Sequence, residues 1–138
     1  MVGPDSEAQA AVTRMSGMFE AGAEFSQPLI AIFLRKGYGL GAMAMTGGSF
    51  AAPTYSASWP TGEFGGMGLE GAVKLGYRKE LDAITDPSEK QRRFEALVAQ
   101  LYEIGKATEA AAHLEIDAVI DPRATRTVIT QVLSAHGL

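Results

Sequence analysis

Residues 28–48, PLIAIFLRKGYGLGAMAMTGG, decide the fold of this chain. The apolar block from Pro28 to Leu34 lacks polar alternation, which predicts a strand buried on both faces of a sheet. Arg35 to Gly37 are expected to end this strand. A glycine-rich turn over residues 39–41 then leads into a small-residue helix, which we expect to start at Ala42 and to end at the next glycine pair. A buried strand followed by a tight turn and a helix is typical of an α/β layered fold.

The turn over residues 39–41 has two interpretations. A strand that feeds a helix in this way leaves the first backbone N–H groups of the helix without partners. Backbone donors that are fixed before charge develops are what an oxyanion hole requires, and glycine lets a reacting group approach closely. The alternative is an ordinary tight turn in a packed domain, because such turns are common. The stretch alone leaves both open.

Composition limits the class of protein. The chain has 138 residues, of which 46% are hydrophobic, so residues 1–138 are expected to form a single domain. Twelve basic against 16 acidic residues give a net charge of -4, which argues against nucleic acid. The chain has no cysteine, and its two histidines, His113 and His136, lie on separate helical segments, so no metal site is expected. No apolar run reaches membrane-span length and the first residues lack signal-peptide features, which predicts a cytoplasmic protein without a membrane segment.

The rest of the chain alternates between helical and strand patterns. Residues 54–59 predict a strand, and residues 116–120 a short edge strand. The expected helices run from a cap at Asp5 or Ser6 to Ala23, over 72–81, from a cap at Ser88 to Gly105, over 107–114, and through a buried stripe at Val128, Ile129, Val132 and Leu133. The helix before Gly105 has a clear apolar stripe, made by Phe94, Leu97, Val98, Leu101 and Tyr102.

Two features have both a packing and a ligand interpretation. Trp59, directly before Pro60, either walls a site or plugs the end of the sheet. The small-residue helix over 42–45 faces either ordinary core or an acyl chain or flat cofactor. The glycine-rich segment over 64–71 is no phosphate-binding loop, because the Lys and Ser/Thr that would contact phosphate and magnesium are missing after it.

Three separated blocks resemble one family. They are RKGYGLGAMAM at 35–45, SWPTGEFGGMGLEGAV at 58–73 and EIDAVIDPRATR at 115–126. They resemble the carboxyltransferases of biotin-dependent acyl-CoA carboxylases, such as the beta subunits of propionyl-CoA, acetyl-CoA and methylcrotonyl-CoA carboxylases. The resemblance implies an α/β crotonase/ClpP-like spiral of strand-strand-helix units. It covers only the later part of the second of the family's two domains.

The resemblance also implies a site. The family's second domain holds the ureido oxygen of biotin with backbone donors, which match Leu40 and Gly41, with Gly39 before them. Leu40 stands where the family often has glycine, which keeps the donor and reduces the clearance. Met43 matches a position that lines the acyl pocket, and Tyr38 and Trp59 match walls of the site.

The resemblance assigns no catalytic role to three family-like carboxylates, Glu63, Glu70 and Asp117, which we interpret as structural. It implies biotin on a partner carrier domain, an acyl-CoA substrate, no metal, a biotin carboxylase partner and a homo-oligomer.

Three functions follow as hypotheses. The first is the biotin-facing half of a carboxyltransferase, which is expected to be inactive without the acyl-CoA half. The second is a non-catalytic assembly module. The third is a crotonase-type hydratase or isomerase, for which Glu63 would be the base. We also expect the isolated chain to self-associate through Met15, Met18, Phe19 and the apolar side of the 94–102 helix.

Overall fold

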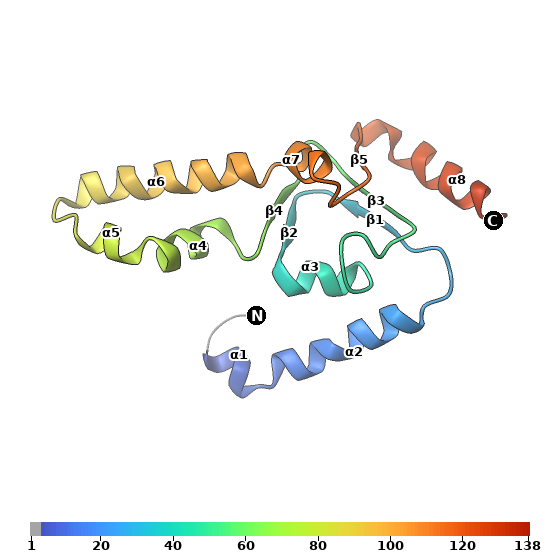
Figure 1. Ribbon diagram of the computed structural model, residues 1–138, viewed down its shortest axis with the longest axis horizontal. Coiled ribbons are helices and arrows are strands. Elements are labelled where there is room, and N and C mark those ends of the chain that lie inside the picture. The colour runs from blue at the N-terminus through green and yellow to red at the C-terminus, as the bar shows by residue number, and fades with distance from the viewer. Residues whose placement is uncertain (1–3) are drawn as a thin grey trace.

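Two short parallel sheets form the centre of the molecule (Figure 1). The computed structural model describes residues 4–138. The strands are β1 (Ile30–Phe33), β2 (Lys36–Tyr38), β3 (Tyr55–Ser58), β4 (Glu63–Gly65) and β5 (Ala118–Val119). One sheet has the order β1-β3-β5, and β2 pairs with β4 in the other. The pairings between these strands are parallel, with Ile30 opposite Tyr55 and Lys36 opposite Glu63.

Helices surround the sheets on several sides. They are α1 (Pro4–Ala8), α2 (Ala11–Glu24), α3 (Gly39–Met45), α4 (Leu69–Gly76), α5 (Arg78–Asp82), α6 (Pro87–Ile104), α7 (Ala107–Ala112), the 3₁₀ turn η1 (Pro122–Ala124) and α8 (Thr125–Ala135). In chain order, β1-β2-α3 and β3-β4-α4 are two successive strand-strand-helix units. The expected fold class is therefore confirmed at the level of its repeating unit.

The strand that opens the motif differs from the prediction. β1 is shorter than expected, and all four of its residues are half-buried and not fully buried. It lies at one edge of its sheet, where only β3 pairs with it. The strand ends before Arg35, as expected, but Lys36 and Gly37 do not stay outside strand structure, because after a bend at Leu34 and Arg35 the chain forms β2.

The core is divided into two clusters. The first surrounds Phe64, whose ring meets the rings of Phe33 and Phe50 edge-on at centroid distances of 4.9 and 5.6 Å. Such edge-to-face pairs add to the free energy gained by burial. The second cluster lies in the arm formed by α4, α5 and α6, which extends away from the sheets (Figure 1).

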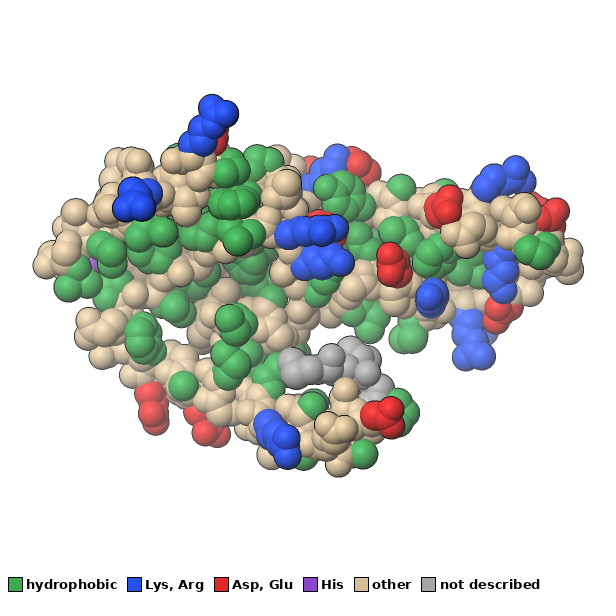
Figure 2. Space-filling view, turned by 180° about the vertical axis from the view of Figure 1, so that it is seen from behind, with side chains coloured by type: hydrophobic (Ala, Val, Ile, Leu, Met, Phe, Trp, Pro, Cys, Tyr) green, Lys and Arg blue, Asp and Glu red, His purple; other side chains and the backbone are tan. Residues whose placement is uncertain are grey.

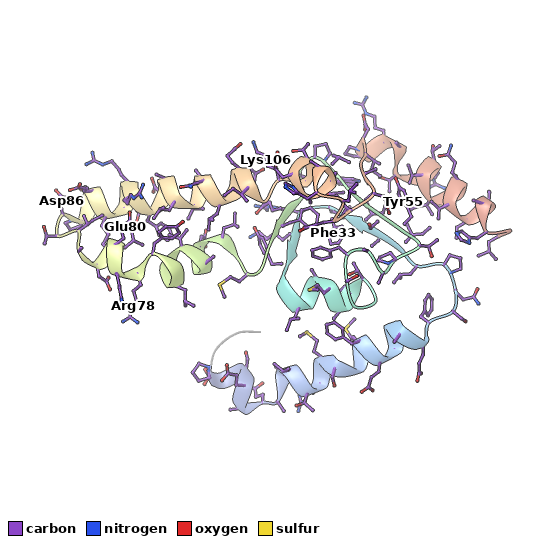
Figure 3. The ribbon with its side chains drawn as sticks, in the orientation of Figure 1. Phe33, Tyr55, Arg78, Glu80, Asp86 and Lys106 are labelled. Carbon is purple, nitrogen blue, oxygen red and sulfur yellow. The ribbon has the colours of Figure 1, made fainter. Side chains whose placement is uncertain are left out.

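The arm buries the predicted apolar stripe of α6. Leu97 is 1% exposed and packs with Val73 and Leu81 from α4 and α5. Phe94, Val98 and Leu101 pack around this cluster. The expectation that this side of α6 is free for self-association is therefore wrong, since the chain's own α4 and α5 cover it. Figure 3 shows Glu80 between the helices of the arm, where its carboxylate pairs with Arg93.

α2 packs through a glycine against the segment that follows α3. A Cβ on Gly22 of α2 would lie 2.6 Å from Cα of Gly47, which follows α3. α2 buries none of its residues fully, and Met18 is 43% exposed. The helix expected from Asp5 or Ser6 is broken into α1 and α2 at Ala10, which adopts a left-handed φ of 54°.

The stripe predicted for the last helix is only half-buried, since α8 has no fully buried residue. Seen from behind, the molecule shows hydrophobic side chains over much of its surface (Figure 2). The large hydrophobic residues that are more than half exposed include Leu34, Met45 and Ile104. No helix within residues 4–138 has the length and apolarity required to cross a bilayer.

The cap of α6 provides a first prediction. Asp86, and not the expected Ser88, is the N-cap, and its carboxylate accepts from the amides of Ser88 and Glu89 at 2.7 and 3.1 Å. Asp86→Ala should lower the free energy of unfolding by about 1 kcal/mol in urea titrations, because it leaves two amides unpaired. Ser88→Ala is the matched control and should change it far less. Equal losses from the two variants would contradict the cap assignment.

Candidate functional site

The candidate site lies where β2 passes into α3. Tyr38 ends β2 in an extended conformation, and Gly39 then turns the chain with a φ of 57°. α3 begins at Gly39, three residues earlier than expected. Leu40 and Gly41 therefore occupy the first turn and do not precede the helix.

The amides of Leu40 and Gly41 lie at the start of α3, where a helix leaves its first donors without helical acceptors. In an α-helix they would bond to the carbonyls of Lys36 and Gly37, but those residues belong to β2. Within residues 4–138, neither amide donates to an acceptor outside α3. The Leu40 side chain is 55% exposed, so it does not bury this end of the helix.

A second glycine segment forms the wall beside the turn. A Cβ on Gly39 would lie 2.6 Å from the carbonyl oxygen of Gly66, just after β4. A Cβ on Gly65 would lie 3.7 Å from the ring of Tyr38. Only glycine combines this clearance with the positive φ of position 39. The low-bulk segment predicted over 64–71 thus contacts the turn directly.

Hydrogen bonds from two side chains to the carboxylate of Glu63 hold the two ends of β2. The Tyr38 hydroxyl donates to Oε2 of Glu63 at 2.6 Å, and Nε of Arg35 donates to Oε1 at 3.2 Å. The hydrogen bond from Tyr38, supported by Arg35, holds the pKa of Glu63 below its usual range. Burial, together with this carboxylate, raises the pKa of the Tyr38 phenol. The pair is therefore an ionised carboxylate and a neutral phenol at neutral pH.

The other expected site residues are placed differently. The indole N–H of Trp59 donates to Oγ1 of Thr125 at 3.0 Å, which ties Trp59 to the start of α8. Met43 lies in α3, one helical turn after Gly39, and is half-buried. Asp117 accepts from the amide of Ser56 at 2.7 Å and so links β3 to the segment before β5. This geometry fits the structural interpretation of Asp117.

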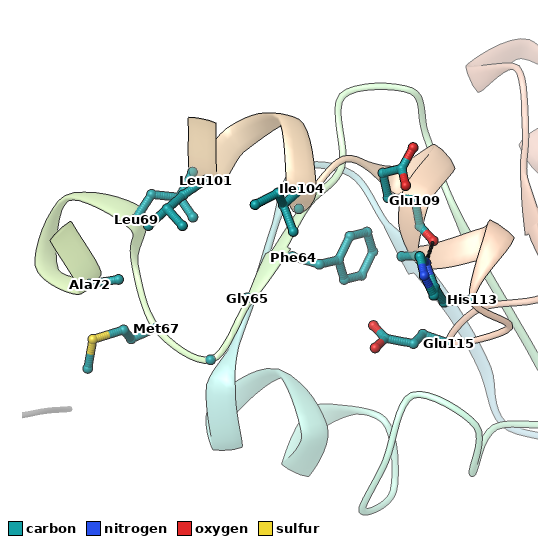
Figure 4. Close-up of a pocket in the computed structure, with 13 residues that line it drawn as sticks. Phe64, Gly65, Met67, Leu69, Ala72, Leu101, Ile104, Glu109, His113 and Glu115 are labelled. Carbon is teal, nitrogen blue, oxygen red and sulfur yellow. Dashed lines mark hydrogen bonds between the residues drawn. The ribbon is translucent and has the colours of Figure 1, made fainter. Parts of the chain in front are cut away.

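A cavity of about 490 Å³ opens beside the Gly65–Gly66 segment (Figure 4). Its walls are largely apolar, with Leu69, Leu101 and Ile104 near one end. His113 and Glu115 lie at the other end, where the imidazole Nδ1 is 2.9 Å from the carbonyl oxygen of Glu109. The sequence did not predict this cavity, because the residues that line it are distributed between Phe64 and Glu115.

The family comparison gives the same assignment as the three sequence blocks. The family model of the carboxyl transferase domain matches residues 1–136. The chain belongs to the carboxyl transferase domain family. The methylmalonyl-CoA carboxyltransferase 12S subunit of Propionibacterium freudenreichii subsp. shermanii is 35% identical over 120 residues, which are 87% of this chain and 22% of that subunit. The resemblance seen in the sequence is confirmed.

Solved structures of carboxyltransferases have the same fold. A single-chain, multi-domain long-chain acyl-CoA carboxylase is 58% identical, with a TM-score of 0.82 over 96% of this chain and 13% of that one. The transcarboxylase 12S subunit is 29% identical, with a TM-score of 0.83 over 99% of this chain and 26% of that one. The chain thus spans about a fifth to a quarter of the length of its curated relatives. The predicted crotonase-like fold is confirmed.

Proposed function

We propose that this chain forms the biotin-facing half of the carboxyltransferase site of a biotin-dependent acyl-CoA carboxylase, as a part of the second carboxyltransferase domain. The observation that carries the proposal is the pair of available amides at Leu40 and Gly41, in a chain of the carboxyl transferase family. Two fixed donors at a glycine turn suit an oxygen that gains negative charge as the reaction proceeds.

The residues of the turn fit biotin. Its ureido oxygen is an acceptor, and the amides of Leu40 and Gly41 are the donors available to it. A Cβ on Gly39 would meet the carbonyl oxygen of Gly66, so main chain forms this side of the turn. When bound, carboxybiotin supplies the carboxyl group that is transferred. Leu40 and Gly41 hold the ureido oxygen, and Tyr38 forms a wall beside it.

The substrate and the partners are part of the same proposal. The second substrate is an acyl-CoA, and Met43 lines the space for its apolar acyl group. The names of the relatives support this class, since they include methylmalonyl-CoA, propionyl-CoA and long-chain acyl-CoA enzymes. We further propose a biotin carboxylase and carrier partner, a homo-oligomer and a cytoplasmic location. The hexamer named for the transcarboxylase 12S structure supports the homo-oligomer. Trp59, bound to Thr125, has the weakest support as a wall of the site.

The geometry favours carboxyl transfer over the hydratase hypothesis. A hydratase or isomerase would need Glu63 as a base aimed at the substrate. Both oxygens of Glu63 already accept hydrogen bonds, from Tyr38 and Arg35, and its lowered pKa makes it a poor proton acceptor.

Gly41→Val tests the donor pair. The added side chain should crowd the point beside the two amides, so carboxyl transfer from a carboxylated acyl-CoA to free biotin should fall by about a hundredfold. The assay requires a complete carboxyltransferase that contains this segment, with thermal unfolding measured in parallel. Near wild-type activity in a folded variant would place the donors elsewhere. Full activity without any acyl-CoA half would instead contradict the role of this chain as one half of a site.

A further inference from the structure

Glu63 has a fixed position that the proposed chemistry does not use. It opens β4 opposite Lys36 of β2, and its amide donates to the carbonyl oxygen of Arg35 at 2.7 Å. Its backbone also forms an antiparallel bridge with Lys106, which Figure 3 shows near the junction of α6 and α7. The main chain around Glu63 is therefore anchored to two separate segments before its side chain is considered.

The carboxylate of Glu63 then reaches both ends of β2. The Glu63 side chain is 14% exposed, whereas that of Arg35 is 70% exposed, so the carboxylate is the inner member of the group. Arg35 directly precedes β2, and Tyr38 is its last residue. β2 has only three residues and one partner strand, so its ladder alone holds its end weakly.

The end of β2 sets the direction of α3. Tyr38 is the N-cap residue of α3, and no side chain caps this helix. The next residue, Gly39, lies so close to the carbonyl of Gly66 that position 39 has no room for a Cβ. The hydrogen bond from Tyr38 to Glu63 fixes Tyr38, the residue before Gly39. These two restraints together leave the first turn of α3 little freedom to rotate.

We propose that Glu63 is a positioning residue, which acts through Tyr38 to aim the amides of Leu40 and Gly41. This inference rests on the proposed function. A charge-assisted hydrogen bond from a phenol to a carboxylate is short and directional, which suits it to fix a turn. Arg35 supplies a positive charge on the other oxygen, so the carboxylate presents less negative potential to a developing oxyanion.

The test compares Glu63→Gln and Tyr38→Phe in a complete carboxyltransferase that contains this segment. Each should lower kcat about tenfold and leave the KM for the acyl-CoA nearly unchanged, because misaimed donors weaken transition-state binding. The double variant should be no slower than the slower single variant, because both changes act on the same charge-assisted hydrogen bond, which Glu63→Gln weakens by removing the charge and Tyr38→Phe removes. Glu80→Gln is the matched control, because Glu80 pairs with Arg93 in the arm of α4, α5 and α6, away from the turn. It should keep wild-type kcat.

Two results would overturn the inference. The first is a Glu63→Gln variant with wild-type kcat, and the second is a double variant whose losses multiply, as expected of two independent structural residues. Leu40→Pro, which deletes a backbone donor, distinguishes a failure of the positioning role from a failure of the proposed function. If Leu40→Pro lowers kcat and Glu63→Gln does not, only the positioning role fails. If Leu40→Pro has no effect, the donor pair fails, and the positioning role fails with it.

Discussion

Leu40→Pro should lower carboxyl transfer by about a hundredfold to a thousandfold, the loss typical of one oxyanion donor. Proline removes the amide hydrogen of position 40 and leaves the rest of the turn in place. Proline is tolerated in the first turn of a helix, where the N–H has no helical acceptor. The measurement is the rate of transfer from a carboxylated acyl-CoA to free biotin.

Leu40→Ala is the control for this variant. It shortens an exposed side chain and keeps the backbone donor, so most of the activity should remain. Thermal unfolding of the two variants shows whether the proline has disturbed α3. If both variants lose activity equally, the side chain and not the amide of Leu40 matters, and the donor assignment is wrong.

The sequence predicted the elements that have a strong local signal. The stripe from Phe94 to Tyr102 spans several helical turns, and α6 follows it to its end at Gly105. The strand over 54–59 and the short edge strand over 116–120 are both present, as β3 and β5. In each case the residues that determine the element lie within it.

The elements that depend on distant partners were missed or misplaced. β2 and β4 have three residues each, KGY and EFG, and neither has an alternating or apolar pattern. They are strands only because they pair with each other across more than 20 residues, Lys36 with Glu63. The same limit applies to the site, since the Glu63 contact to Tyr38 follows from that pairing.

The tertiary role of Gly105 also had no local signal beyond a helix end. Gly105 caps α6 with a φ of -94°, which any residue can adopt. Its carbonyl oxygen accepts from the amide of Phe64 at 2.7 Å, and a Cβ at this position would lie 2.2 Å from the carbonyl oxygen of Phe64. Glycine is therefore required here by the approach of β4 and not by its own backbone conformation.

Gly105→Ala should consequently lower the free energy of unfolding by about 3 kcal/mol, at the upper end of the cost of overpacking. The methyl group meets a backbone carbonyl, which cannot rotate away as a side chain can, so α6 and β4 must separate. Gly71→Ala is the matched control, because Gly71 lies inside α4 and a methyl group added there would have nothing within 4 Å. It should raise stability by about 0.5–1 kcal/mol, since alanine favours the helix. Urea unfolding of both variants measures whether the free energy of unfolding falls or rises in each. A Gly105→Ala variant as stable as Gly71→Ala would show that β4 does not pack against the end of α6.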